Sequence, residues 1–181
     1  YRNYVPGCEN ARMLWTSQTL GVRESRRILG DYVLNTDDFT RQAVFEDEIG
    51  RYGYPIDLHG TRHTDKWKGD SDSELFESYC YKNPGESYGI PYRILLPRKL
   101  ENTLVAGRCV STDRQMHGSI RVQAGCFITG QAAGMAAVLA AGRSVTPRRI
   151  PVAELQAKLV KIGAFLPNFR NVQGGVSCVR H

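Results

Sequence analysis

Residues 102–140, NTLVAGRCVSTDRQMHGSIRVQAGCFITGQAAGMAAVLA, carry the strongest indication of the fold. The first part of this stretch, residues 103–110, is predicted to be a short strand buried on both faces, as strands of parallel sheets are. A polar loop over residues 111–118 follows, and residues 119–142 are predicted to form a long helix with little charge. A buried strand that runs through a loop into a helix is typical of an α/β fold.

The predicted long helix is rich in small residues, among them Gly130 and Gly134. Small side chains let a helix lie very close to a sheet, so tight packing without a ligand is one explanation. The other is a binding site, because the first turn of a helix offers unpaired N–H groups and partial positive charge to an anionic or dipolar ligand. Arg121 lies at the helix start, where a cation is disfavoured, which indicates either a specific anionic partner or a salt bridge.

The loop before this helix adds polar groups at the carboxyl end of the predicted strand. Open α/β sheets bind ligands at this edge. The polar side chains of the loop are those of Ser111, Thr112, Asp113, Arg114 and His117. The strand, the loop and the helix start together predict a ligand site.

The segments on both sides of this stretch complete a mixed α/β pattern. Apolar residues at helical spacing predict helices over residues 8–22, 37–50 and 151–162, and strand-like patterns cover residues 28–35, 76–82 and 90–97. Polar residues 60–74 predict an exposed loop, and residues 83–85, Asn-Pro-Gly, predict a turn.

Composition limits the classes of protein to which the chain could belong. The 181 residues, 41% of them hydrophobic, suffice for one compact domain or one domain plus a fragment, and no apolar run approaches the length of a membrane span. The five cysteines include no CxxC pair, so we expect neither a disulfide framework nor a metal site. Cys109 and Cys126 lie in apolar or small-residue surroundings, where a buried free thiol is expected.

The net charge of +6 is confined to the C-terminal stretch. Residues 141–181 carry seven basic side chains and one acidic side chain, whereas residues 1–140 balance. A short basic tail is more often a solvated face than a binding patch, so nucleic acid is not an expected partner.

Several ordered motifs resemble the FAD-dependent oxidoreductase family related to the flavoproteins of fumarate reductase and succinate dehydrogenase. The first is the run at residues 102–140. The others are GVRESRRILGDYVLNTDDF (21–39), YPIDLHG (54–60), YGIPYRILLP (88–97) and ELQAKLVKIGAFL (154–166), in the order in which the family has them. The resemblance extends from about residue 7 to residue 166 of the chain.

The resemblance implies FAD as the cofactor. It places the backbone of Arg121, Val122 and Gln123 at the pyrimidine edge of the flavin, where a helix N-terminus would stabilise negative charge on the reduced ring. The other implied cofactor-binding residues are Gly107, Arg108, Ser119 and Gly130. Arg108 stands where related flavoproteins have a glutamate near the sugar chain of the cofactor, which removes the reason to expect a ribose contact from that side chain.

The same resemblance implies a substrate side. Arg26, Tyr92, Arg93 and His117 are the polar residues expected near the isoalloxazine, where they would orient a carboxylate or hydroxyl group and move a proton during hydride transfer. For the arginines, an ion pair with an acidic neighbour such as Glu24 is the alternative.

The family's N-terminal GxGxxG unit, which cradles the FAD pyrophosphate, does not occur in this sequence. We therefore expect a C-terminal portion whose partner is the missing N-terminal half, so that these residues alone bind FAD poorly and are inactive. Residues 1–100 would form a mixed antiparallel sheet that caps the substrate. Residues 101–142 would be the last strand and helix of a Rossmann-like domain, and residues 143–181 a basic helical tail.

The predicted activity is hydride transfer between FAD and a small organic substrate. A cytoplasmic location is the default expectation, since any export signal would lie in the missing portion. The alternative is a stand-alone binding or scaffold domain that has lost the cofactor.

Overall fold

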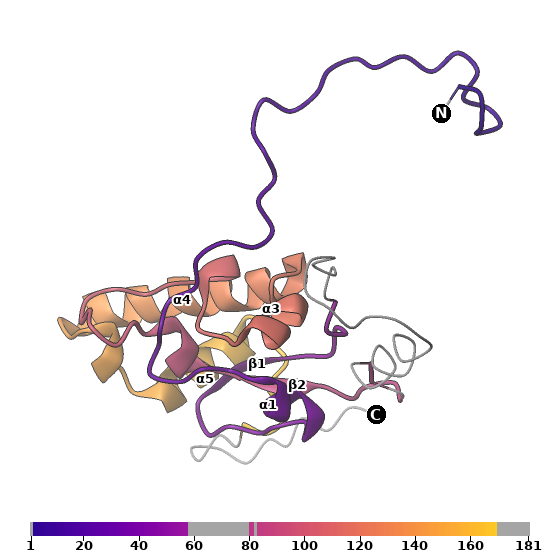
Figure 1. Ribbon diagram of the computed structural model, residues 1–181. Helices are drawn as coiled ribbons and strands as arrows, with labels where there is room; N and C mark the ends of the chain where they lie inside the picture. Colours follow the sequence, from indigo (N-terminus) through magenta and orange to yellow (C-terminus); the bar gives the residue numbers. More distant parts are fainter. Residues whose placement is uncertain (1, 58–79, 82, 170–181) are drawn as a thin grey trace.

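The computed structural model describes residues 2–57, 80–81 and 83–169 (Figure 1). Its elements, in chain order, are α1 (Thr36–Thr40), β1 (Glu48–Tyr52), β2 (Tyr88–Pro91), η1 (Tyr92–Leu95), η2 (Gly107–Cys109), α3 (Arg114–Ile120), α4 (Gln123–Arg143), η3 (Pro147–Arg149) and α5 (Val152–Lys161). The combination of helices with a small sheet is a mixed α/β arrangement, as the sequence predicts.

The sheet consists of β1 and β2, which pair antiparallel from Glu48 opposite Pro91 to Tyr52 opposite Tyr88. One face of β1 is covered by α4, and the approach is close. A Cβ atom on Gly50 would lie 2.6 Å from a side-chain carbon of Ile128 on α4. Glycine at this position therefore permits the helix to lie directly against the strand.

The long helix α4 has one buried face. Its buried residues are Gly125, Thr129, Ala132, Ala136, Leu139 and Ala140. These small side chains pack against β1, α5 and η3, and they join a core whose largest members are Tyr88, Tyr92 and Phe39. The helix ends at Ser144, whose φ of 52° is in the left-handed region that terminates helices.

The amphipathic helix predicted at residues 151–162 is present as α5. Leu155 and Leu159 are completely buried on its inner face. The amide of Gln156, also on this face, donates to the carbonyl oxygens of Glu46 at 2.8 Å and Glu48 at 3.0 Å. These two hydrogen bonds attach α5 to the start of β1.

The helix predicted over residues 37–50 is wrong beyond its first turn. Asn35 caps α1 and forms a capping box with Asp38, but the helix stops after five residues. Gln42 then adopts a φ of 52°, which ends the helix, and Ile49 and Gly50 become part of β1. Tertiary pairing with β2 outweighs the local helical spacing of the apolar residues.

The strands predicted on either side of the sheet are longer than the observed ones. Residues 28–35 contribute only two isolated bridges, from Gly30 to Pro97 and from Leu34 to Thr112. In the predicted strand 90–97, β2 ends at Pro91 and a 3-10 helix follows, as expected from a residue that cannot donate to a ladder.

Residues 103–110 do not form the buried parallel strand on which the Rossmann-like interpretation depends. Residues 103–106 have no regular structure and are half-buried, and residues 107–109 are the 3-10 helix η2. The amide of Val105 donates to the carbonyl of Leu95 at 2.9 Å, but no ladder develops among the described residues. A strand needs neighbours on which to build a ladder, and sequence pattern alone does not supply them.

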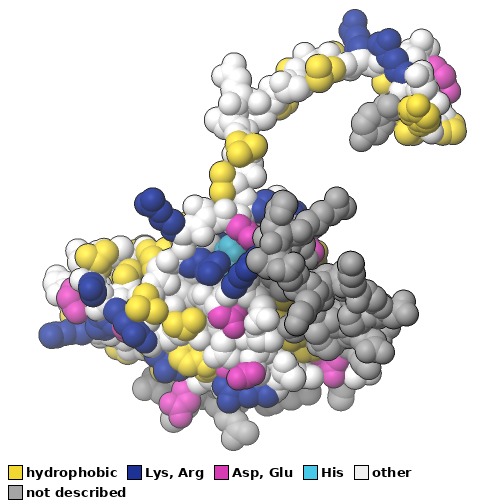
Figure 2. Space-filling view, viewed as in Figure 1, with side chains coloured by type: hydrophobic (Ala, Val, Ile, Leu, Met, Phe, Trp, Pro, Cys, Tyr) yellow, Lys and Arg dark blue, Asp and Glu magenta, His cyan; other side chains and the backbone are white. Residues whose placement is uncertain are grey.

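The predicted helix at residues 8–22 is absent as well. Residues 2–27, which we call the N-terminal arm, are exposed, largely without regular structure, and extend away from the body (Figure 1). Leu14 and Trp15 are both 78% exposed, so no packed face stabilises a helix here. Hydrophobic side chains recur along the arm and over the surface formed by α4 (Figure 2).

The remaining predictions concern the middle of the chain. The turn at residues 83–85 is confirmed. The loop predicted at residues 60–74 lies outside the described residues, as does most of the strand predicted at residues 76–82. The loop predicted over residues 111–118 is largely the helix α3, and the long helix begins at Gln123 rather than at residue 119.

The helix α4 is long and apolar enough, by length and composition alone, to cross a membrane, although the sequence predicted no such segment. Its mean hydropathy is 1.5, and 33% of its most apolar stretch is buried inside the protein. Core helices of globular domains pass the same test, so this is weak evidence for a span. Packing against β1 and α5 explains the apolar composition of its inner face.

Candidate functional site

The candidate site is the turn between α3 and α4, which we call the α3–α4 corner and define as residues 117–124. Two residues separate the helices: Arg121 caps α3, and Val122 is extended, with φ of −69° and ψ of 154°. The first amides of α4 consequently have no acceptor within their own helix. Gln123 and Ala124, the first two residues of α4, are both exposed.

The electrostatics of the corner favour an electron-rich group. A helix of 21 residues presents partial positive charge at its N-terminus, and the first turn of α4 contains no acidic residue and no side-chain cap. The phenol of Tyr52 lies nearby: burial raises its pKa, and the backbone amide of Gly125 opposes that shift. The amides of Gln123 and Ala124 are therefore the donors best placed to meet a bound molecule.

The side chain of Arg121 is buried and forms its contacts within the protein. It is 5% exposed, forms an ion pair with Glu24 and donates to the backbone oxygen of Asp57 at 2.9 Å. A buried guanidinium requires such partners. The side chain of Arg121 therefore forms the salt bridge that the sequence allowed as one of two explanations. Only the backbone of this residue can face a ligand.

His117 is completely buried in the corner and only one of its ring nitrogens is satisfied. Its Nε2 lies 2.8 Å from the carbonyl oxygen of Arg108, so Nε2 carries the proton and donates. Its Nδ1 is then a bare acceptor, and within the described ranges it has no hydrogen-bond partner. Burial lowers the pKa of His117, and the bond to Arg108 opposes that shift, so the neutral form is favoured.

Ser119, predicted to bind the cofactor, is buried and fully occupied by protein contacts. Its hydroxyl donates to the backbone oxygen of Tyr54 at 2.6 Å and lies 2.9 Å from the hydroxyl of Tyr88. This arrangement connects α3 to β2 and to the segment after β1. Ser119 therefore stabilises the corner through its contacts with Tyr54 and Tyr88.

Three other residues predicted to contact the cofactor lie in α4 or beside it. Gly107 has a φ of +73°, and its amide donates to the hydroxyl of Thr129 at 3.0 Å. Arg108 and Gly130 are exposed, and a Cβ on Gly130 would have no atom within 4 Å among the described residues. The space over this part of α4 is open.

Tyr92 and Arg93, predicted to be catalytic, contact other parts of the molecule than the corner. Tyr92 is buried, and its hydroxyl donates to the carbonyl of Pro147, beyond the C-terminal end of α4. Arg93 forms an ion pair with Asp47 at 3.0 Å and lies over the ring of Tyr32. Arg26 is exposed at the base of the arm. Of the four predicted catalytic residues, only His117 belongs to the corner.

Several residues that organise the site were not predicted from the sequence. Thr129 accepts from Gly107, and Tyr52 and Tyr88 approach the corner from the sheet. A threonine among alanines and glycines in α4 was the available signal for the first. No sequence pattern marked the tyrosines, because their role depends on the pairing of β1 with β2. Within the described residues, no group of three potential metal ligands occurs.

A comparison with protein families matches residues 1–159 to the FAD dependent oxidoreductase family. The chain belongs to this family. FAD is therefore its expected cofactor, oxidoreduction its expected activity, and a small molecule its expected substrate. Comparisons with curated proteins and with solved structures found no match.

Proposed function

We propose that this chain supplies the flavin-ring side of an FAD site and takes part in hydride transfer between FAD and a small organic substrate, as in flavoproteins related to fumarate reductase and succinate dehydrogenase. The observation that carries the proposal is the open N-terminus of α4, where Gln123 and Ala124 are exposed and the N-cap residue, Val122, makes no side-chain cap. Oriented backbone donors of this kind stabilise negative charge.

The residues of the corner fit the flavin ring. The amides after Val122 would hold an oxygen of the pyrimidine edge, and the exposed, small-residue face at Gly130 leaves room for a flat group. FAD, when bound, supplies the two-electron redox chemistry. Gly107 and Arg108, on η2 beside α4, would lie along the remainder of the cofactor.

The side chains of the corner have different tasks in this proposal. The ion pair between Glu24 and Arg121 holds the turn in place, so that the backbone from Arg121 to Gln123 keeps its orientation. His117 is neutral and presents a bare Nδ1, which can accept a proton from a substrate hydroxyl. Its bond to the Arg108 carbonyl holds the tautomer that leaves Nδ1 free.

The remainder of the FAD site is proposed to come from an N-terminal half of the same protein. This chain contains no GxGxxG phosphate-binding motif, and α4 has an exposed face that includes Phe127 at 70% and Val138 at 69% exposure. A face of this kind is suited to packing against further secondary structure. Residues 1–181 alone would then bind FAD weakly and lack activity.

The decisive experiment is Gln123→Pro in the full-length protein. Proline removes the amide of the first helical residue, where it is tolerated, and Val122 already has the extended backbone that a residue before proline requires. A hydrogen bond to a charged group contributes about 1.5–3 kcal/mol, which corresponds to a fall of roughly 30–60 mV in the two-electron potential. Potentiometric titration of the bound flavin measures this shift.

Gln123→Ala is the matched control, because it removes the same side chain and keeps the amide. It should leave the potential close to that of the parent protein. Thermal melting of all three proteins shows whether folding is preserved. A folded, flavin-loaded Gln123→Pro protein with an unchanged potential would contradict the proposal.

A further inference from the structure

Two cysteines lie on segments that pack against each other at the edge of the corner. Cys109 is the last residue of η2, and Cys126 lies in the first turn of α4. Both are free thiols. The sequence predicted that both would be buried, but Cys109 is exposed and Cys126 is half-buried. One thiol is therefore open to solvent, and the other is partly covered.

A single hydroxyl joins the two segments that carry these thiols. The Oγ1 atom of Thr129 accepts from the amide of Gly107 at 3.0 Å, and it also contacts the carbonyl oxygen of Cys126 at 3.0 Å. The start of η2 is thus held against the turn of α4 that contains Cys126. Two residues after Gly107, the chain reaches Cys109 on the same short 3-10 helix.

Both thiols lie on elements in direct contact, because η2 packs against α4. Burial raises the pKa of the Cys126 thiol, and the charge of Cys109 raises it further, while Arg108 opposes both. The Sγ atom of Cys126 donates to the carbonyl oxygen of Arg121 at 3.3 Å, so this thiol also contacts the corner itself. Oxidation of the Cys126 sulfur would therefore remove a contact of the turn that precedes α4.

We propose that Cys109 and Cys126 form a reversible disulfide in response to a peroxide, which makes the edge of the α3–α4 corner a redox-sensitive site. The Cys109 thiolate attacks one oxygen of hydrogen peroxide, the O–O bond breaks, and a sulfenic acid and hydroxide form. That hydroxide takes the proton of the Cys126 thiol, whose sulfur then attacks the sulfenic sulfur and displaces a second hydroxide. In total, two thiols and one peroxide give one disulfide and two waters.

The two thiols have different roles in this reaction because they differ in exposure. Cys109 is accessible to a small oxidant, whereas Cys126 is half-buried and is placed to resolve the sulfenic acid. Closing the disulfide removes the S–H donor from the Arg121 carbonyl and ties η2 covalently to α4. The inference concerns the thiols of this chain and does not depend on the proposed flavin site.

The test is treatment of the full-length protein with stoichiometric hydrogen peroxide, followed by alkylation, digestion without reductant and mass spectrometry. We expect a peptide pair joined through Cys109 and Cys126 that dithiothreitol separates. Cys126→Ser should leave a sulfenic acid on Cys109 that dimedone traps. Cys109→Ser should leave Cys126 reduced.

Cys80→Ser is the matched control, because Cys80 is also a half-buried free thiol but lies outside η2 and α4. It should form the Cys109–Cys126 disulfide as fully as the parent protein. Circular dichroism confirms that each variant is folded. Pairing of Cys109 with another cysteine, or its oxidation to sulfinic acid while Cys126 remains reduced, would overturn the proposal.

Discussion

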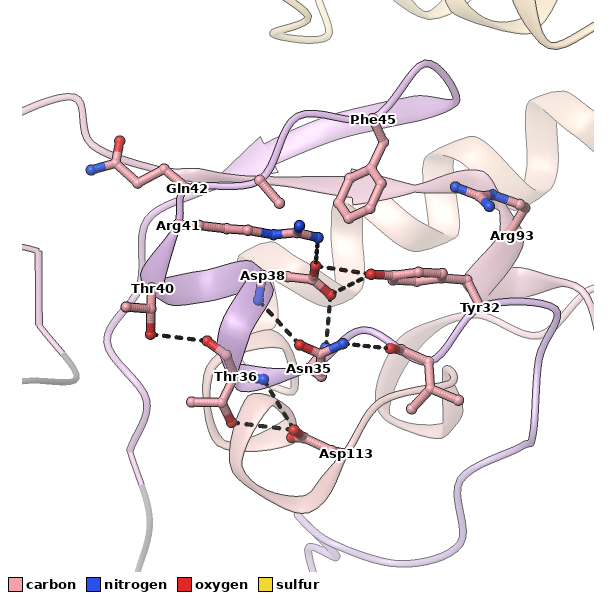
Figure 3. Close-up of polar contacts among 12 residues, drawn as sticks. Tyr32, Asn35, Thr36, Asp38, Thr40, Arg41, Gln42, Phe45, Arg93 and Asp113 are labelled. Atoms are coloured by element: carbon pink, nitrogen blue, oxygen red, sulfur yellow. Dashed lines mark hydrogen bonds and ion pairs between the residues drawn. The ribbon is translucent and has the colours of Figure 1, made fainter.

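Two polar regions of this molecule differ in how completely their groups are paired. The first, which we call the α1 cluster, consists of Tyr32, Asn35, Asp38 and Arg41 (Figure 3). The buried carboxylate of Asp38 accepts from the Tyr32 hydroxyl at 2.8 Å, from the Asn35 amide at 3.1 Å and from Arg41. The second region is the α3–α4 corner, where buried Nδ1 of His117 has no partner in the described part of the chain.

This difference separates a structural network from a candidate binding site. A buried polar group without a partner is costly and uncommon, so each one requires an explanation. The α1 cluster needs none, since its donors and acceptors satisfy one another. The corner combines a buried, unpartnered ring nitrogen with exposed helix amides, so it is the candidate binding site of the two regions.

The largest effect should come from breaking the α1 cluster. Asp38→Ala leaves the Tyr32 hydroxyl and the Asn35 amide without their acceptor, and we expect a loss of about 2–4 kcal/mol in the free energy of unfolding. Asp37→Ala, at the neighbouring position of α1, should change it by less than about 0.5 kcal/mol. Urea denaturation measures both. A comparable loss from the two variants would mean that the cluster is not what stabilises this region.

A smaller effect is expected at the ion pair that holds the corner. Glu24→Gln leaves the buried guanidinium of Arg121 without a carboxylate, and because Glu24 is 46% exposed, water can replace part of the contact. We expect a loss of about 1–2 kcal/mol together with a changed flavin potential in the full-length protein. Glu9→Gln makes the same substitution at an exposed position of the arm, and it should alter neither quantity.

The pH dependence of stability distinguishes the unpartnered His117 from the satisfied α1 cluster. The pKa of His117 is lowered in the folded state. As the pH falls below about 6.5, the unfolded chain therefore binds more protons than the folded chain, and stability is lost in that range. Above a pH of about 7.5 the neutral form dominates in both states. His117→Gln, which can still donate to Arg108, should lose less stability than the parent protein between pH values of about 7.5 and 5.5. Acid titrations of both proteins, followed by circular dichroism, measure this difference. Equal losses of stability would mean that His117 does not contribute to the pH dependence.

The smallest effect is expected on the open face of α4. Gly130→Ala adds a methyl group into free space and improves helix propensity, so it should stabilise residues 1–181 by up to about 1 kcal/mol. Gly125→Ala is its counterpart on the buried face, where the added carbon would clash with the Ile120 carbonyl oxygen. Thermal melting should therefore move in opposite directions for the two variants. Equal shifts would mean that the face at Gly130 is covered.

Some of the site could be predicted from the sequence because the signal is local. The start of the long helix is predicted to within about one turn, since a long run of small and apolar residues has few alternatives to a helix. His117 is recognisable as a candidate from its place in the segment before that helix. The bare Nδ1 could not be predicted, because it depends on a carbonyl contributed by Arg108.

The errors occurred where long-range pairing decides the conformation. Residues 37–50 have helical spacing, yet Ile49 and Gly50 belong to β1, whose partner β2 lies about forty residues further along the chain. Trp15 and Leu14 also have helical spacing, yet no partner surface in the described part of the chain covers them and the arm stays extended. Cys109 was expected to be buried because its strand was expected to be buried, and both predictions failed together.

The family, the cofactor class and the amphipathic helix α5 could all be predicted from the order of the residues. Each of these rests on an order of motifs or on a periodicity that short-range chemistry imposes. Three features depend on how the chain folds: Arg121 forms its ion pair with Glu24, Tyr92 and Arg93 contact other parts of the molecule than the corner, and Cys109 is exposed. The physical reason is the same in each case: a side chain's partner comes from a distant segment, and burial rather than local preference selects it.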